Sequence, residues 1–512
     1  MSDSKRIAKN TGFLYIRMFI IMAVQLYTSR VVLDKLGADD YGLYNVVGGV
    51  VGLLSFLTGT LSIGTSRFIT YELGAGDAQK LRATFVTSFY THFALSVIIV
   101  FLLETAGLWF FYNHLIIPQE RLDAAFWVYQ ISILTTVFAI TQVPYTSAIM
   151  AHEKMDVYAY LSIFEAVARL LVVYLLSVAP YDKMLVYAIL IAIVQILLAL
   201  FYFVFCVGKF NECRLNLTFD KSIFKKLLGF SGWNITANIA EVLRAQGVIV
   251  LINMFFQPAI VAAQAIGNQI TNAMMQFINN IRTAVNPQII KLYASGDYEG
   301  SKRLTLKSSL YVFDLLLLLG LPFILLMEPI LNLWLKEVPP YTVVFAQCIV
   351  ASQIIGNFAA AFYIPMMAAN KIKKNSIAAV VFSFTNFALL FVILKMGGSV
   401  MWVQYIYILN SILWSYFIKP YILFKDIDYN IPEMARCMFA TFKVGLVSCI
   451  FAIPFRLWLD NSIIECIIIL IVTLLSVLLS SYIFMYKEDS QRVRSFISNK
   501  IILYLRNDNN RL

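Results

Sequence analysis

Long apolar runs alternate with short polar breaks along almost the whole chain. Each run is close to the roughly 20 residues that a helix needs to cross a membrane. The first six runs lie at residues 11–33, 43–66, 85–106, 124–150, 157–179 and 184–207. Eight more lie at residues 231–254, 259–285, 308–328, 341–368, 376–395, 400–424, 438–458 and 463–485. The pattern predicts an all-α polytopic membrane protein with about fourteen transmembrane helices.

A polar, basic stretch divides these runs into two sets. We expect residues 208–230 to form an amphipathic cytoplasmic linker between an N-terminal six-helix lobe, 1–207, and a C-terminal six-helix lobe, 231–425. Two additional transmembrane helices follow within 426–486, and 487–512 is predicted to be a basic cytoplasmic tail.

Glycine-aspartate turns recur at matching places in the two lobes. Residues 71–77 (YELGAGD) follow the second apolar run, and residues 292–297 (LYASGD) follow the eighth. Both turns lead into a basic amphipathic segment. Because each lobe has an even number of spans and starts on the same side, the repeat predicts two lobes related by a parallel pseudo-two-fold axis.

The composition argues against a soluble fold. Of the 512 residues 60% are apolar and 13% are charged, whereas soluble domains contain about 25% charged residues. The net charge of +11 does not predict a nucleic-acid partner, because lysine and arginine collect in the cytoplasmic loops of membrane proteins. With the N-terminus in the cytoplasm, the outer side holds only Lys35, Arg121, Lys183, Lys336, Lys395 and Arg456. We therefore expect both termini in the cytoplasm.

No catalytic signature is present in the sequence. It contains no Walker loop, GxSxG elbow or GxGxxG fingerprint. His92, His114 and His152 lie far apart, and the six cysteines form no CxxC pair. We expect a protein that is not an enzyme, with no catalytic residue, metal or cofactor.

Several features together resemble a known family. They are a charged N-terminus before the first run, the stretch LDKLGADDYGLYNVV at 33–47, the Gly-Ala-Gly-Asp turn, and six plus six plus two spans. The chain resembles the polysaccharide and O-antigen flippases (Wzx type) of the multidrug/oligosaccharidyl-lipid/polysaccharide (MOP) exporter superfamily. The resemblance implies a MATE-like fold.

It also implies a function. A flippase of this kind moves an undecaprenyl-diphosphate-linked oligosaccharide, such as an O-antigen or capsular repeat unit, across the bacterial inner membrane by alternating access. The expected location is therefore the inner (plasma) membrane, as a multi-pass protein. The expected partners are the lipid-linked oligosaccharide, membrane lipids and polysaccharide assembly proteins.

Charged residues inside the predicted spans are the candidate binding residues. A charge in mid-membrane is costly, so each should face a partner, a bundle interior or water. Arginine suits a diphosphate because its planar guanidinium forms paired hydrogen bonds to phosphate oxygens. The alternative is structural: arginines near helix ends reach the headgroups, and Glu165 with Arg169, or Glu241 with Arg244, form ion pairs within one helix. The predicted diphosphate-binding residues are Arg17, Arg169, Arg244 and Arg282, and the predicted cavity ion pairs involve Glu165 and Glu241.

Glu241 has a second possible role that the resemblance suggests. Related transporters use an acidic residue on the seventh span to hold a coupling cation. Arg244, one turn away, departs from that pattern because an arginine partner weakens cation binding. Asn386 is a candidate neutral ligand. Coupling of transport to Na⁺ or H⁺ is thus an open alternative.

Three other charged residues are expected to have structural roles. Asp314 lies inside the ninth run, where Lys307 is the basic residue at helical spacing, and we expect a hydrogen-bonded structural acid. Arg30 and Asp34 are predicted to pair at the outer end of the first run.

Two other functions compete with flipping. A MATE-type multidrug or cation antiporter predicts an acidic, aromatic cavity, whereas the candidate residues include four arginines and two glutamates. A membrane-embedded glycan polymerase or transferase predicts a large outer loop, and the predicted outer loops are short. Both alternatives are disfavoured.

Overall fold

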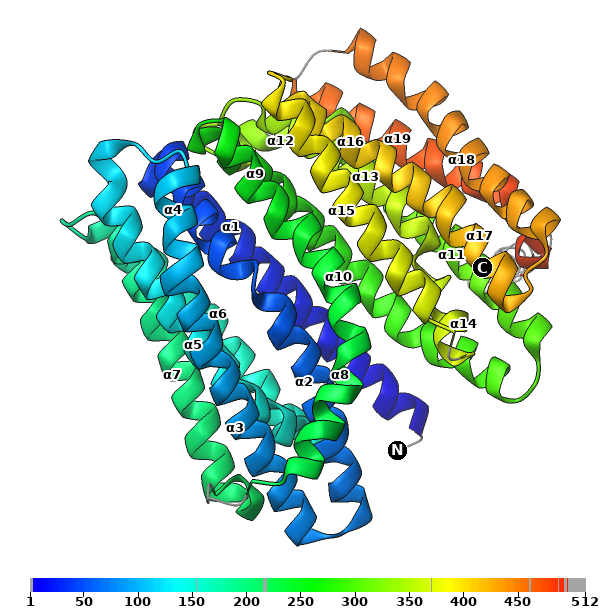
Figure 1. The fold of residues 1–512 in the computed structure, drawn as a ribbon. Coiled ribbons are helices and arrows are strands. Elements are labelled where there is room, and N and C mark those ends of the chain that lie inside the picture. The colour runs from blue at the N-terminus through cyan, green and yellow to red at the C-terminus, as the bar shows by residue number, and fades with distance from the viewer. Residues whose placement is uncertain are drawn as a thin grey trace, which may run out of the picture. The chain divides into compact units, whose positions relative to one another are not determined.

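The computed structural model describes residues 3–152, 154–214, 219–369, 371–459, 462–486, 488–491 and 495. Regular structure in these residues is helical, with no strand among them (Figure 1). Ten helices of the described part are long and apolar enough to cross a membrane. The predicted all-α class is therefore confirmed.

Each of the first six apolar runs falls on helical structure. The first predicted break, 34–42, falls inside α1 around the non-helical Gly37, and polar residues at later helix starts cap the exposed backbone groups. Asp77 and Asp182, for example, accept backbone hydrogen bonds at the starts of α3 and α7. The elements are α1 (Asp3–Gly52), α2 (Ser55–Ala75), α3 (Ala78–Leu102), η1 (Leu103–Gly107), α4 (Leu108–His114), η2 (Gln119–Arg121), α5 (Leu122–Ala151), α6 (Met155–Val178) and α7 (Lys183–Lys209).

The later runs are helical too, but several are interrupted. The elements are η3 (Asn211–Cys213), α8 (Lys221–Val242), η4 (Leu243–Gly247), α9 (Val248–Phe255), α10 (Pro258–Ala294), α11 (Tyr298–Leu325), α12 (Met327–Trp334), α13 (Thr342–Asn357), η5 (Phe358–Ala360), α14 (Tyr363–Ala368), α15 (Lys373–Lys395), α16 (Met401–Ile412), η6 (Leu413–Ile418), α17 (Lys419–Ile427), α18 (Ile431–Trp458) and α19 (Ile463–Phe484). The segments η1, η4 and η6 are π-helical, a form that is rare and frequent at functional sites.

Two positions in the second half of α1 require glycine, one because of its backbone conformation and one because of close packing. Gly37 has φ 80° and ψ 170°, which breaks the helix between the first two predicted spans. At Gly42 a Cβ atom would lie 1.8 Å from the carbonyl oxygen of Pro258, so only glycine permits this approach of α1 to the start of α10. Both glycines belong to the conspicuous stretch at 33–47.

The chain forms two compact units, whose segments alternate along the sequence. Unit 1 comprises Met1–Gln269, Asn332–Ala346 and Ser376–Ile406, and unit 2 comprises Ile270–Leu331, Gln347–Asn375 and Tyr407–Leu512. The predicted lobes, linker and tail, which rest on the repeat, stay a prediction. The helix α8 starts at Lys221, inside the range expected to be linker.

In unit 1, α5 packs against α1, α2, α3 and α7, and α6 packs against α1 and α7. The core between them is apolar and includes Val47, Phe111, Val128 and Tyr129, all fully buried. In unit 2, α11, α18 and α19 pack on one another.

Candidate functional site

Two of the predicted residues lie outside the described side chains. Arg17 is on α1 and Glu241 is on α8, and the helical backbone is described at both positions, but their side chains are not. Their roles in binding a diphosphate or a cation stay predictions.

Glu165 and Arg169 form an ion pair within α6. The Nε and Nη2 atoms of Arg169 both donate to Glu165 Oε1, at 3.1 and 2.8 Å. Both side chains are about 40% exposed. Arg169 also interacts electrostatically with Tyr44 of α1 and Tyr187 of α7, whose rings lie 4.8 Å apart. The pair is therefore half open to its surroundings and flanked by two tyrosines.

Arg244 lies in the π-helix η4, in unit 1 like Arg169. It is exposed and makes a polar contact. Three residues further on, the Phe387 ring of α15 comes within 3.2 Å of a Cβ built on Gly247. Asn386, the candidate cation ligand, is the neighbour of Phe387 on α15 and is partly buried. The helix α15 and η4 thus pack together close to Asn386, one of the two residues predicted to bind a cation.

Arg282 forms the clearest polar site in unit 2. Its Nη2 donates to Asn357 Oδ1 at 2.8 Å, at the end of α13. Asn357, 8% exposed, in turn donates to Gln353 Oε1 at 2.9 Å. The Nε of Arg282 is buried with no hydrogen-bond partner, and no described carboxylate forms an ion pair with this arginine. The guanidinium therefore has one hydrogen-bond donor without an acceptor and a positive charge without a described negative partner.

A second cation, missed in the sequence analysis, reaches the same helix break. Lys419, the first residue of α17, donates from Nζ to the carbonyl oxygen of Ala359 in η5 at 3.1 Å. Its ammonium also lies 5.7 Å from the ring centroid of Trp414. A lysine inside the predicted run 400–424 is the same kind of signal that identified the arginines, so the sequence could have revealed it.

The 3₁₀ turn η5 explains why these groups converge. A break in the helix leaves carbonyl oxygens without their usual helical partners. Ser415 of η6 donates to the oxygen of Gly356 at 3.0 Å, and the Phe358 ring stacks on Tyr416 at 4.9 Å. We call Arg282, Asn357 and Lys419 the η5 site. It presents two cations and an amide, which suits a phosphate oxygen.

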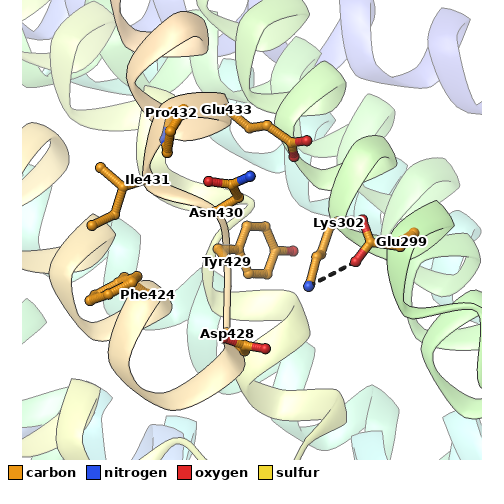
Figure 2. Close-up of a pocket in the computed structure, with 9 residues that line it drawn as sticks. All are labelled: Glu299, Lys302, Phe424, Asp428, Tyr429, Asn430, Ile431, Pro432 and Glu433. Carbon is orange, nitrogen blue, oxygen red and sulfur yellow. Dashed lines mark hydrogen bonds and ion pairs between the residues drawn. The ribbon is translucent and has the colours of Figure 1, made fainter.

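A separate pocket of about 450 Å³ in unit 2 has the opposite character (Figure 2). It lies between the start of α11 and the turn from α17 to α18. Lys302, its lysine, is bound to Glu299 at 2.9 Å and lies 5.9 Å from the centre of the Tyr429 ring. Burial raises the pKa of Tyr429, so its hydroxyl stays neutral. Asp428 and Glu433 add further negative charge, which disfavours an anion here.

The outer-end pair predicted in α1 has a different partner. Asp34 Oδ2 accepts a hydrogen bond from Lys336 Nζ at 2.7 Å and lies 3.6 Å from Lys35 Nζ. None of the ion pairs among the described residues joins Asp34 to Arg30. The prediction was wrong because spacing within a helix says nothing about a lysine 302 residues away.

Comparisons with known proteins place the fold. The family model described as MatE matches residues 14–175. An inward-facing multidrug resistance MATE family transporter of the MOP superfamily matches 81% of the chain and 99% of its own length, with TM-score 0.64 and 12% identity. The lipid II flippase MurJ, in an inward closed conformation, matches 92% of the chain and 98% of its own length, with TM-score 0.69 and 12% identity.

A third match has been described as having a binding pocket of reversed polarity. It is a MOP superfamily transporter from Pyrococcus furiosus, with TM-score 0.55 and 15% identity over 80% of this chain and 96% of its own. No curated protein sequence matches the chain. The chain thus has the MATE-like, all-α fold that these MOP superfamily transporters share.

Proposed function

We propose that the protein is a flippase that moves a lipid-linked oligosaccharide, carried on a diphosphate, across a bacterial inner membrane by alternating access. The η5 site is the observation that supports this most. Arg282 is partly buried, bonded to a neutral amide and free of any described carboxylate. Such a cation is costly in a membrane protein unless an anion or water completes it. A diphosphate headgroup supplies that anion.

The fold adds support. The lipid II flippase covers a larger share of this chain than the MATE transporter does, 92% against 81%. We propose that Arg17, Arg169 and Arg244 contribute further positive charge to the transport path, with Glu165 and Glu241 as their internal partners. In this view the partners are membrane lipids and proteins that assemble polysaccharide, and both chain termini lie in the cytoplasm.

The test is flipping in proteoliposomes. The substrate is a fluorescent oligosaccharide on a polyprenyl diphosphate, and the readout is the rate at which the fluorophore changes leaflets. We expect Arg282→Ala and Lys419→Ala each to slow flipping by about tenfold or more, the equivalent of one or two charge-assisted hydrogen bonds. Lys395→Ala is the control, because it removes the same charge from the exposed end of α15. Wild-type rates in both η5 variants would refute the proposal.

The same vesicles separate the competing function. A MATE-type antiporter would move a cationic dye against a sodium or proton gradient, and loss of Arg282 would leave that transport intact or increase it. The matching MATE structure is the reason to include this assay. Adding each gradient during flipping also tests coupling. A response to Na⁺ or H⁺ that is lost in Asn386→Ala would support a cation site next to η4.

A further inference from the structure

We propose that Asp314 is a proton-binding site in unit 2, at the seam where α11, α18 and α19 pack together. The carboxyl group holds a proton while these helices are packed and releases it when water enters between them. This role is independent of the substrate proposed above.

Asp314 is buried without a charged partner. Its side chain is 9% exposed, and its Oδ1 has no hydrogen-bond partner among the described residues. We had expected a hydrogen-bonded acid, with Lys307 as the nearby base. Lys307 is instead bound to Asp489 at 2.8 Å. The carboxyl therefore keeps one hydrogen-bonding neighbour, the hydroxyl of Ser481, but no basic one.

The two helices that cover Asp314 offer it only weak polar groups. From α19 the hydroxyl of Ser481 is a hydrogen-bonding neighbour of the carboxyl, and it forms no other hydrogen bond among the described residues. From α18 the thiol of Cys437 faces it, and this thiol donates to the carbonyl oxygen of Leu306 at 3.4 Å. Neither group can neutralise a carboxylate.

The other neighbours of α11 do not supply a cation either. On α11 itself the hydroxyl of Tyr311 lies close to Asp314 but donates to Asp489. The elements η5 and α14 also pack against α11. Their ionisable residue is Tyr363 of α14, which carries no positive charge. The helices α10 and α13 contribute Met274 and Ile354 next to Gly320 of α11, and Arg282 of α10 is bound to Asn357. No ion pair of the described residues includes Asp314.

Further buried hydroxyls lie between α18 and α19. Ser480, next to Ser481, shares a hydrogen bond with Ser448 at 2.7 Å. Ser476 lies one turn further along α19 and contacts the Ser448 carbonyl oxygen at 3.4 Å. These groups add polar atoms to an otherwise apolar seam. The seam alone would be ordinary helix packing, but it lies beside a buried carboxyl that has no charged partner.

A proton fits this site better than a metal ion. Hard cations take several oxygen ligands, whereas the Ser481 hydroxyl is the hydrogen-bonding oxygen beside the carboxyl among the described residues, since the Tyr311 hydroxyl donates to Asp489. The described residues contain no cluster of three or more metal-binding side chains. An ionised carboxylate without a partner is far more costly to bury than a neutral acid. The proton removes that charge and supplies the missing donor.

Infrared spectroscopy on the purified protein tests the proposal directly. The spectrum of Asp314→Asn is subtracted from that of the wild type at pH values from about 6 to 9. We expect the carbonyl stretch of a protonated carboxylic acid at pH 7, in place of the carboxylate bands. The control is Asp426→Asn, because Asp426 is bound to Lys374 at 2.5 Å and should give carboxylate bands at pH 7. Carboxylate bands at pH 7 for Asp314 too would overturn the proposal.

Thermal unfolding gives a second, independent readout. If folding takes up a proton at Asp314, the folded-to-unfolded ratio of the wild type should fall by up to tenfold per pH unit relative to Asp314→Asn as the pH rises from about 6. Parallel pH profiles would contradict the proposal. Asp314→Thr, which also removes the carboxyl group, takes the place of the asparagine variant if that variant does not accumulate.

Discussion

The guanidinium of Arg121 donates two hydrogen bonds to the carboxylate of Asp40, from Nε to Oδ1 at 2.8 Å and from Nη2 to Oδ2 at 2.6 Å. Its Nη1 binds Asp182 Oδ2 at 2.5 Å. One arginine thus joins three parts of unit 1: the second half of α1, the turn η2 and the connection before α7. Paired, charge-assisted bonds of this kind hold a fixed geometry as well as adding stability.

Removing Arg121 should loosen this end of unit 1. All three side chains are about one third exposed or less, so both carboxylates would lose a partner in a partly desolvated site. We expect Arg121→Ala to lower the free energy of unfolding by about 1–3 kcal/mol, and Arg121→Lys to recover only part of it because lysine lacks the fork. Thermal unfolding measures both. The neighbouring exposed Glu120→Ala is the control, and an equal effect in that variant would contradict the assignment.

Gly42 should tolerate no side chain. A Cβ there would collide with the Pro258 backbone at 1.8 Å, and backbone cannot move aside cheaply. We expect Gly42→Ala to cost about 3 kcal/mol or more, or to prevent accumulation of the protein. Gly48→Ala is the matched control on the same helix, since nothing lies within 4 Å of its Cβ position. Alanine there should be neutral or stabilising by up to about 1 kcal/mol. Equal stability of the two variants would disprove the close approach.

The contact between Asp34 and Lys336 should make stability depend on acid pH. The hydrogen bond from Lys336 outweighs burial and lowers the pKa of Asp34. A carboxyl with a lowered pKa stabilises the fold above its ordinary value, about 3.9, and loses that contribution as the pH falls through the lowered one.

The unfolding midpoint of Lys336→Met should therefore lie below that of the wild type at neutral pH, and the two should converge as the pH falls below about 4. Lys336 is 60% exposed, so the effect should not exceed about 1 kcal/mol. Lys35→Met is the control because its ammonium lies further away, at 3.6 Å. If the difference in unfolding midpoint between Lys336→Met and the wild type is as large below about pH 4 as at neutral pH, the contact does not cause the acid dependence.

A carboxylate placed next to Arg282 should compete with an anionic substrate. Asn357→Asp keeps the size of the side chain whose oxygen lies 2.8 Å from Arg282 Nη2. The new ion pair should slow flipping by about tenfold by satisfying the arginine internally. In an Arg282→Ala background the same change should have no further effect, because the partner is gone. An equal loss in both backgrounds would show that Asn357 acts independently of Arg282.

The apolar pattern alone determined the class and the positions of the helices. Every predicted run falls on helical structure, because a helix that crosses a membrane needs about 20 apolar residues whatever its neighbours are. Breaks between helices could also be predicted from the sequence, because capping residues such as Asp77 and Asp182 lie at helix starts.

The contacts between helices were decided by the tertiary structure. Lys419 meets Ala359 across 60 residues, Asp34 meets Lys336 across 302, and Gly42 meets Pro258. Which groups meet depends on the rotation and register of packed helices, and a helix that is apolar all around carries little signal for either. Asp314 shows the limit most clearly. The sequence places this acid and Lys307 on one helix, but in the packed structure Lys307 binds Asp489 and the carboxyl of Asp314 has no charged partner.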